Sequence, residues 1–167
     1  NIIYANNLNL ESAVTEDSSY SKRLSKRSVL YYQKAIALYP YYAEFHYKAA
    51  QVLQYKLKDY ETAEIYYKNS LKLDSNYLDV NFQLGKIYFD KKEYKTSFEN
   101  FSKSYNKNPG DSLTLYYLSE NANAVGDLET VYNANKEFTR LYPNVIYPYM
   151  NLGVCDSKMM KDDSAVI

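Results

Sequence analysis

The chain has 167 residues, enough for one compact domain or a short array of repeats. Its 20 Lys and Arg residues balance 20 Asp and Glu residues, so it lacks the net positive charge with which nucleic-acid-binding proteins attract phosphates. Four glycines and four prolines are too few for the turns of an all-β fold, whereas 22 tyrosines can fill helix interfaces or line a wet groove. No apolar run approaches the roughly 20 residues that a membrane-spanning helix needs.

Helices are the elements that the apolar pattern predicts along the chain. Residues 1–20 are rich in Asn and Ser, and we expect a poorly defined flank there. It is either a degenerate helix, to which Leu8, Leu10 and Val14 contribute, or an ordered tail. Farther on, seven helices and the start of an eighth are predicted, at Ser21–Leu38, Ala43–Lys56, Tyr60–Leu73, Tyr77–Lys91, Tyr94–Asn106, Ser112–Val125, Leu128–Leu141 and about Ile146–Met160.

A fixed period organises these helices. One period separates Pro109 from Pro143, and each proline ends a unit because proline cannot continue a helix. Leu84–Gly85 corresponds to Leu118–Ser119 at the same offset, while one inserted residue is expected in the earlier turn Lys56–Lys58. The predicted organisation is a flank at 1–20 and an array at 21–167, with a partial unit to 42, units at about 43–77, 78–111 and 112–145, and a truncated unit at 146–167.

The repeated residues resemble the tetratricopeptide repeat family. The shared features are a Leu-Gly pair with a following aromatic residue, an Asp-Tyr turn, a small-aromatic-small series and a closing proline, here Leu84, Gly85, Tyr88, Asp59, Tyr60, Ala63, Tyr67, Ser70 and Pro109. The interval between the two prolines also equals the repeat length of this family, about 34 residues. Over roughly residues 21–161, the resemblance implies an all-α fold, a right-handed α-solenoid of tandem antiparallel helix pairs.

Some positions depart from the family pattern. Asn135 stands where a bulky aromatic residue is usual, and Phe138 stands where the family has a small residue. His46 and Asn81 occupy positions that are usually given to large apolar residues. We therefore expect a different helix spacing or angle in the unit that holds Asn135 and Phe138.

In this family the first helix of each pair lines a concave surface that binds extended peptides or partner helices. Carried over by register, and expected to lie off the core-facing stripe, the candidate groove residues are Tyr47, Gln51, Asp79, Phe82, Gln83, Lys86, Tyr116, Tyr117, Glu120, Asn123, Met150 and Asn151. Aromatic rings offer large contact areas, and amides can bond a peptide backbone as donor and acceptor. The alternative is that tyrosine simply occupies surface positions in a tyrosine-rich chain.

One class of partner is not expected. Family members that clamp the C-terminal carboxylates of chaperones use Lys, Arg and Asn on these helices. The matching positions here are Tyr47, Gln51, Gln83, Leu113 and Tyr117, which offer no cation. Chaperone tails are therefore excluded from the predicted partners, and without an arginine the groove is a poor match for phosphorylated peptides.

No pattern in the sequence predicts catalysis, a metal or a cofactor. His46 is the single histidine and Cys155 the single cysteine, so neither a zinc site nor a nucleophile–base pair is predicted, and both residues are expected to be structural. The four glycines are scattered and form no phosphate-binding loop. The basic segment Ser21–Arg27 is expected to be a solvated helix face, with a localisation signal, a phosphosite or a contact with an acidic partner as alternatives.

The predicted function is that of a non-enzymatic protein-interaction scaffold that holds a peptide or helix. The alternative is a structural spacer or oligomerisation segment of a larger protein, because the truncated last unit leaves Tyr149 and Leu152 without a second helix. Either more chain or another subunit would cover them, so self-association through this end is one expectation. Since the chain starts at Asn1 and stops within a unit, we expect a fragment or a processed product. The sequence leaves the compartment open and favours the cytoplasm only slightly over a secreted or periplasmic location.

Overall fold

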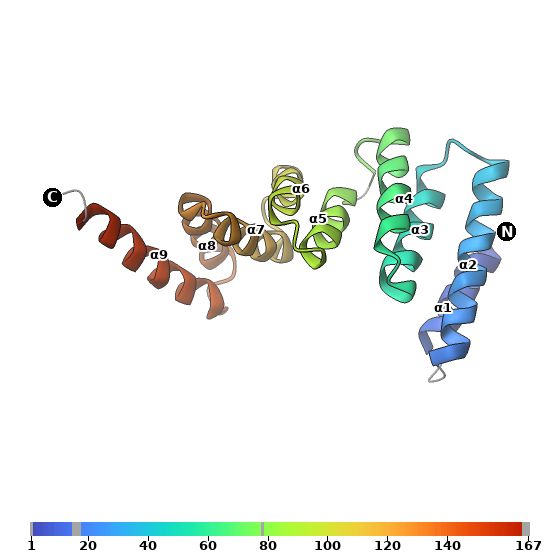
Figure 1. The fold of residues 1–167 in the computed structure, drawn as a ribbon, viewed down its shortest axis with the longest axis horizontal. Helices are drawn as coiled ribbons and strands as arrows, with labels where there is room; N and C mark the ends of the chain where they lie inside the picture. The colour runs from blue at the N-terminus through green and yellow to red at the C-terminus, as the bar shows by residue number, and fades with distance from the viewer. Residues whose placement is uncertain (1, 15–17, 78, 165–167) are drawn as a thin grey trace. The chain divides into compact units, whose positions relative to one another are not determined.

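The structure is a computed structural model that describes residues 2–14, 18–77 and 79–164. Within these residues all regular structure is helical, as predicted (Figure 1). The helices are α1 (Ile2–Val14), α2 (Ser18–Leu38), α3 (Ala43–Val52), the π-helical segment η1 (Leu53–Leu57), α4 (Tyr60–Leu73), α5 (Val80–Asp90), α6 (Tyr94–Lys107), α7 (Ser112–Val125), α8 (Leu128–Leu141) and α9 (Tyr147–Ser164). The chain divides into two compact units, residues 1–83 and 84–167. None of the described helices is long and apolar enough to span a membrane.

In the first unit, α1 packs on α2, α2 on α3, and α3 on α4. Of the two alternatives for the N-terminal flank, the helix is correct. Buried polar contacts as well as apolar ones hold α1 to α2: the Ser28 hydroxyl donates to the Ala5 carbonyl at 2.9 Å, and the Tyr32 hydroxyl donates to Asn6 Oδ1 at 2.6 Å. Leu8 is buried as expected, but Leu10 is 66% exposed, and the side chain of Val14 lies outside the described residues.

The inserted residue of the first full repeat, residues 43–77, lies in η1. The helix predicted to reach Lys56 is α-helical only to Val52 and continues as a π-helix to Leu57. A π-helical turn holds one more residue than an α-helical turn, so it absorbs an insertion without interrupting the helix. After this segment the repeats follow one another without a further insertion. The backbone shows this: Lys58, Lys92 and Gly126 stand one period apart, and all three have a positive φ, at 57°, 62° and 82°.

Aspartate side chains define several helix starts. Asp59, Asp111 and Asp127 each accept a hydrogen bond from the backbone N–H three residues later, at 3.1, 2.7 and 3.0 Å. Such caps satisfy amide groups that lack partners inside the helix, and α4, α7 and α8 begin and end where predicted. Helix α5 begins at Val80 rather than at Tyr77, since Asp79 provides its cap by accepting from the Phe82 N–H at 3.1 Å.

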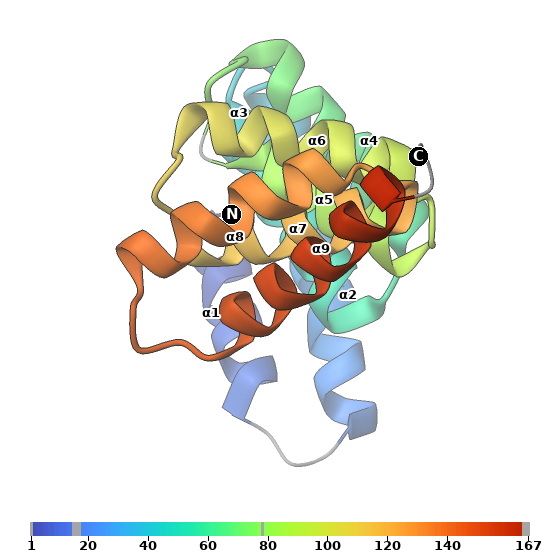
Figure 2. The same cartoon turned by 90° about the vertical axis from the view of Figure 1, so that its left-hand side faces the viewer.

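In the second unit, α6 packs on α7, α7 on α8, and α8 on α9, which lies in front of α8 in Figure 2. The aromatic residue of the family pattern, Phe101, is fully buried against Gly85. Its counterpart Asn135 is also fully buried, and its amide group donates to the Ser119 hydroxyl at 2.6 Å and to the Val131 carbonyl at 2.7 Å. These bonds satisfy the polar side chain where the pattern predicts a ring.

Candidate protein-interaction surface

The predicted groove residues lie on α3, α7 and α9 and on α5 with its cap, which are the first helices of their pairs. We call this the first-helix surface and describe it separately for each unit. Asn123 and Met150 are exposed, Tyr47 is buried, and the other nine candidates are half-buried. The expectation that these side chains avoid the core is therefore wrong for Tyr47.

Tyr47 is a packing residue of the first unit. Its ring contacts Tyr67 and Tyr77 edge to face, with centroids 5.6 and 5.5 Å away, and only 7% of the residue is exposed. Gln51 donates to its hydroxyl at 3.3 Å. Burial, with the nearby Tyr55 and Asp79, raises the pKa of Tyr47. The helical register places Tyr47 on the side of α3 that faces away from the core, but the loop residue Tyr77 covers it.

Polar side chains of the first unit are already engaged with one another. Gln83 accepts a hydrogen bond from the hydroxyl of Tyr55, a residue in η1 that was not predicted to belong to the surface. The Asp79 carboxylate caps α5 by accepting a hydrogen bond from the Phe82 N–H, so it stabilises the helix start. Tyr55 is 38% exposed, which leaves it accessible from outside. Its position depends on the π-helical insertion, and no sequence pattern places that insertion to the residue.

A tyrosine cluster forms the first-helix surface of the second unit. The Tyr116 ring contacts Tyr117 at 5.1 Å and Tyr147 at 5.2 Å between centroids. The Tyr147 hydroxyl donates to the Glu120 carboxylate. Burial is the main cause that raises the pKa of Tyr147, and this hydrogen bond is the second cause. Tyr147 was missed, although it stands one period after Leu113, a position already compared with the chaperone clamp.

Tyr117 belongs as much to the core as to the surface. Its ring stacks on Phe101 with centroids 4.9 Å apart and an interplanar angle of 2°, and meets Phe89 edge to face at 5.3 Å. Loss of this ring would therefore disturb packing as well as any bound partner. Tyr117 is half-buried, so the more exposed neighbours are better probes of binding.

A small hollow in the second unit is lined by two amides, Asn123 and Asn151, together with Val131, Val154, Cys155 and Lys158. Asn123 and Asn151 come together there, around a cavity of about 70 Å³ whose wall includes the buried Cys155. The Asn151 amide also donates to Asn135 Oδ1 at 3.4 Å, which ties the surface to the buried polar group of α8. The neighbouring Met150 is 66% exposed.

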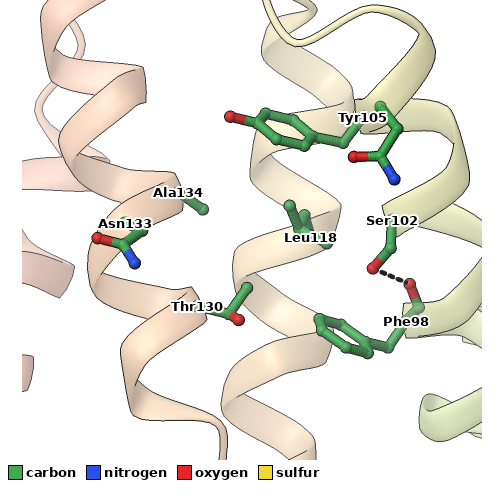
Figure 3. A pocket seen from close by; sticks show the side chains of 8 residues that line it. Phe98, Ser102, Tyr105, Leu118, Thr130, Asn133 and Ala134 are labelled. Carbon is green, nitrogen blue, oxygen red and sulfur yellow. Dashed lines mark hydrogen bonds between the residues drawn. The ribbon is translucent and has the colours of Figure 1, made fainter.

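A larger hollow of about 260 Å³ lies among α6, α7 and α8, away from the predicted residues (Figure 3). Leu118, Phe98 and Ala134 form its apolar part, and Thr130 and Asn133 stand at its α8 side. The register contains a signal for it, since the residues one and two periods before Ala134 are Asn100 and Tyr66. The side chain at this repeat position becomes smaller from Tyr66 to Asn100 to Ala134, and the small Ala134 side chain leaves the hollow open.

The two residues with possible chemistry, His46 and Cys155, are both buried. His46 is buried beside the Tyr66 ring, 5.7 Å between centroids, and burial lowers its pKa. Its Nδ1 atom is buried without a hydrogen-bond partner. Cys155 is 2% exposed, and burial raises the pKa of its thiol, which disfavours the nucleophilic thiolate. Among the described residues, no group of three or more His, Cys, Asp or Glu side chains is placed to hold a metal ion.

Comparisons with known proteins identify the fold. The tetratricopeptide repeat profile matches residues 43–77. No curated protein matches the sequence. Among solved structures, YrrB, described as a TPR protein with an unusual peptide-binding site, is 21% identical with a TM-score of 0.76, over 95% of this chain and 77% of its own. MamA is 18% identical with a TM-score of 0.72, over 90% of this chain and 87% of its own.

MamA 41-end from Desulfovibrio magneticus RS-1 is 19% identical with a TM-score of 0.72, over 97% of this chain and 87% of its own. At these identities the structural likeness establishes the fold and leaves the partners open. The prediction of tandem helix pairs of the tetratricopeptide type is confirmed. Residues 43–77 match the tetratricopeptide repeat by sequence, and the chain has the helical-repeat fold of tetratricopeptide repeat proteins over most of its length.

Proposed function

We propose that this chain is a non-enzymatic protein-interaction scaffold, and that the first-helix surface of the second unit binds an extended peptide or a helix. The observation that carries the proposal is the tyrosine cluster of Tyr116, Tyr117 and Tyr147 on two successive first helices, with Glu120 and the Asn123–Asn151 hollow in the same unit. Aromatic rings give contact area at low entropic cost, and amides bond a peptide backbone in both directions.

The fold supports a peptide as the partner. YrrB, which shares the fold, is described as having an unusual peptide-binding site. The second-unit surface carries Lys86 and Glu120, and Lys158 lines the wall of the hollow, so neither sign of charge dominates and the surface favours a peptide with few charges. The positions that correspond to the chaperone clamp, among them Leu113 and Tyr117, offer no cation to a carboxylate-rich chaperone tail.

The experiment starts from a random peptide library selected on the wild-type chain. The dissociation constant of a selected peptide is then measured for the double variant Asn123→Glu, Met150→Glu, whose two sites are exposed and therefore tolerate charge. We expect at least tenfold weaker binding, since two carboxylates would have to be desolvated under the peptide. Ile65→Glu, at a 59% exposed helical site of the other unit, is the matched control and should bind as the wild type does. Equal affinity of the double variant would reject this surface.

A second candidate function is a spacer or oligomerisation segment of a larger assembly. The exposed apolar residues near and on α9 favour it, since Ile146, Met150 and Val154 are 74%, 66% and 54% exposed. Sedimentation velocity at increasing concentration tests it directly. A concentration-dependent dimer that Val154→Glu dissociates would support this candidate, and a strict monomer would speak against oligomerisation.

A further inference from the structure

A separate hollow lies in the first unit, where the second helices α2 and α4 meet η1. We call it the α2 hollow. The segment η1 packs on both helices, which belong to the blue-to-green half of the chain in Figure 1. The volume of the hollow is about 410 Å³, and its lining residues are Lys26, Val29, Leu30, Gln33, Leu53, Leu57, Asp59 and Thr62. None of them belongs to the first-helix surface.

The floor of the α2 hollow is apolar and held in place. Leu53 and Leu57 are the first and last residues of η1, so the π-helical insertion supplies part of the lining. Leu53 and Val29 are only 4% and 7% exposed, whereas Leu30 is 55% exposed. Gln33 of α2 donates to the Tyr66 hydroxyl of α4 at 3.0 Å and so ties the two helices together. An apolar side chain that enters the hollow would cover Leu30 and release the water around it.

Helix α2 carries the charge that indicates the kind of ligand. The chain as a whole has no net charge, yet α2 contains neither Asp nor Glu, and its basic residues are Lys22, Arg23, Lys26, Arg27 and Lys34. Lys22, Lys26, Val29 and Gln33 follow one another at intervals of three or four residues and therefore share one face of the helix. This face places two lysines in line with the apolar hollow, so it is complementary to a ligand that is both acidic and apolar.

We propose that the α2 hollow binds a linear peptide segment of a partner protein in which a leucine or phenylalanine stands near a cluster of acidic residues. The apolar side chain enters the hollow between Leu30 and Leu57. The carboxylates lie over Lys26 and Lys22, which precede Leu30 by about one and two helical turns. The basic segment Ser21–Arg27, for which an acidic partner is one of the alternatives, thereby has a role.

Asp59 sets the direction of the peptide. It is the acidic residue of the lining, stands on the α4 side, and accepts a hydrogen bond from the Thr62 N–H at 3.1 Å. Because like charges repel, the acidic residues of the peptide lie along α2 and away from Asp59. Asp59→Asn keeps the cap, since asparagine caps a helix as well as aspartate does, and should tighten the binding of an acidic peptide about twofold.

The helix packing leaves this site to a ligand rather than to a further repeat. Helices α1 and α3 pack on α2, and α3 packs on α4, so the helices around the hollow already have their neighbours in the array. Repeats of a solenoid are added beyond its first or last helix. The α2 hollow lies between successive second helices within the first unit, where the stacking of repeats does not cover it.

The experiment selects a random peptide library in parallel on the wild-type chain and on the Lys26→Glu variant. Peptides enriched only on the wild type should share a leucine or phenylalanine near Asp or Glu. Fluorescence anisotropy of such a peptide should show about tenfold weaker binding to Lys26→Glu, because an attraction becomes a repulsion, and about fivefold weaker binding to Leu30→Ala, because apolar contact is lost. A peptide with lysine in place of its acidic residues should bind Lys26→Glu more tightly than it binds the wild type.

The matched controls are Lys34→Glu and Leu38→Ala. They repeat the two changes on the same helix, at residues outside the hollow, and Leu38 is 64% exposed. Both variants should bind the peptide within about twofold of the wild type, since distant surface charges are screened by salt. A loss with Lys34→Glu as large as the loss with Lys26→Glu would overturn the proposal, because the charge of the whole helix would then attract the peptide without the hollow.

Three other results would overturn it. They are a consensus without acidic residues, binding to phosphatidylserine vesicles without binding to any acidic peptide, and a dimer of the chain alone that Lys26→Glu dissociates. The second result would make an anionic membrane the ligand, and the third would make it a second copy. The selected acidic peptides should bind the Asn123→Glu, Met150→Glu variant normally, so failure of this proposal is distinguishable from failure of the proposed function.

Discussion

At the scale of single residues, the two glycines of the Leu-Gly pairs should respond in opposite ways to the same substitution. Gly85→Ala places a methyl group against Phe101 and should lower the free energy of unfolding by about 1–3 kcal/mol through overpacking. Gly153→Ala meets no described atom and should raise it by about 0.5–1 kcal/mol, because alanine favours the helix. Urea denaturation of both variants measures the difference. A gain in stability at Gly85 would contradict the packing described for Phe101.

His46 should make the first unit sensitive to acid. Burial lowers the pKa of its imidazole below the ordinary value of 6.5, so the unfolded chain binds a proton more readily than the folded chain does. The contribution of His46 is fully present above the ordinary pKa and is lost as the pH falls through the lower pKa of the folded state. His46→Phe should therefore remove part of the fall in stability between pH 7.5 and 5.5, as measured by urea denaturation. Identical pH profiles for wild type and variant would contradict the burial of a neutral imidazole.

At the scale of elements, the turns between first and second helices offer a test of the backbone. Lys92 and Gly126 occupy the same turn position with φ of 62° and 82°. Glycine adopts this conformation freely, whereas other residues lose about 1–2 kcal/mol there, so Lys92→Gly should stabilise modestly and Gly126→Ala should destabilise by about 1 kcal/mol. Differential scanning calorimetry of the pair checks both signs. Equal melting temperatures for the wild type and Gly126→Ala would refute the left-handed conformation.

The hollow among α6, α7 and α8 should accept a larger side chain. Ala134→Leu places apolar atoms in a cavity of about 260 Å³ beside Leu118 and Phe98. Filling such a space commonly raises the free energy of unfolding by about 0.5–2 kcal/mol. Thermal denaturation measures the gain, with Ala122→Leu as the control, since Ala122 is fully buried and should be destabilised by the same change. Destabilisation at Ala134 would mean that the hollow cannot accommodate the side chain.

Elements marked by caps and prolines could be predicted from the sequence because their causes are local. Asp59, Asp111 and Asp127 fix the starts of their helices with their own side chains, and those helices have the predicted bounds. Helix α1 was not predicted unambiguously, since its stability depends on contacts with α2, such as that between Asn6 and Tyr32. The spacing between repeat positions located the inserted residue to within a few residues. It could not distinguish a longer turn from a π-helical segment, because both lengthen the repeat by one residue.

The candidate surface was harder to predict than the fold. Register places Tyr47 on the side of α3 that faces away from the core, yet Tyr77, from a loop of irregular length, covers it. The same register would have identified Tyr147, whose hydroxyl bonds to Glu120. Side chains at a repeat position are thus predictable by their helix, whereas their exposure depends on loops and on neighbours of different size.

At the scale of the whole molecule, the chain consists of two compact units of packed helices that are rich in tyrosine. The chain has no net charge and 22 tyrosines, so its surfaces offer rings and amides more than electrostatic attraction. Such surfaces favour close contact with a specific partner over long-range steering, and the affinity should depend weakly on salt. The proposed scaffold accordingly offers the tyrosine cluster as its contact surface.

The most direct test of the central claim is hydrogen–deuterium exchange of the wild-type chain with and without a selected peptide. The account predicts slower exchange in α7 and α9, the helices that carry Tyr116, Glu120, Asn123 and Asn151. Protection confined to α6 and α8, around the hollow of Figure 3, would contradict it and would place the binding site on the second helices.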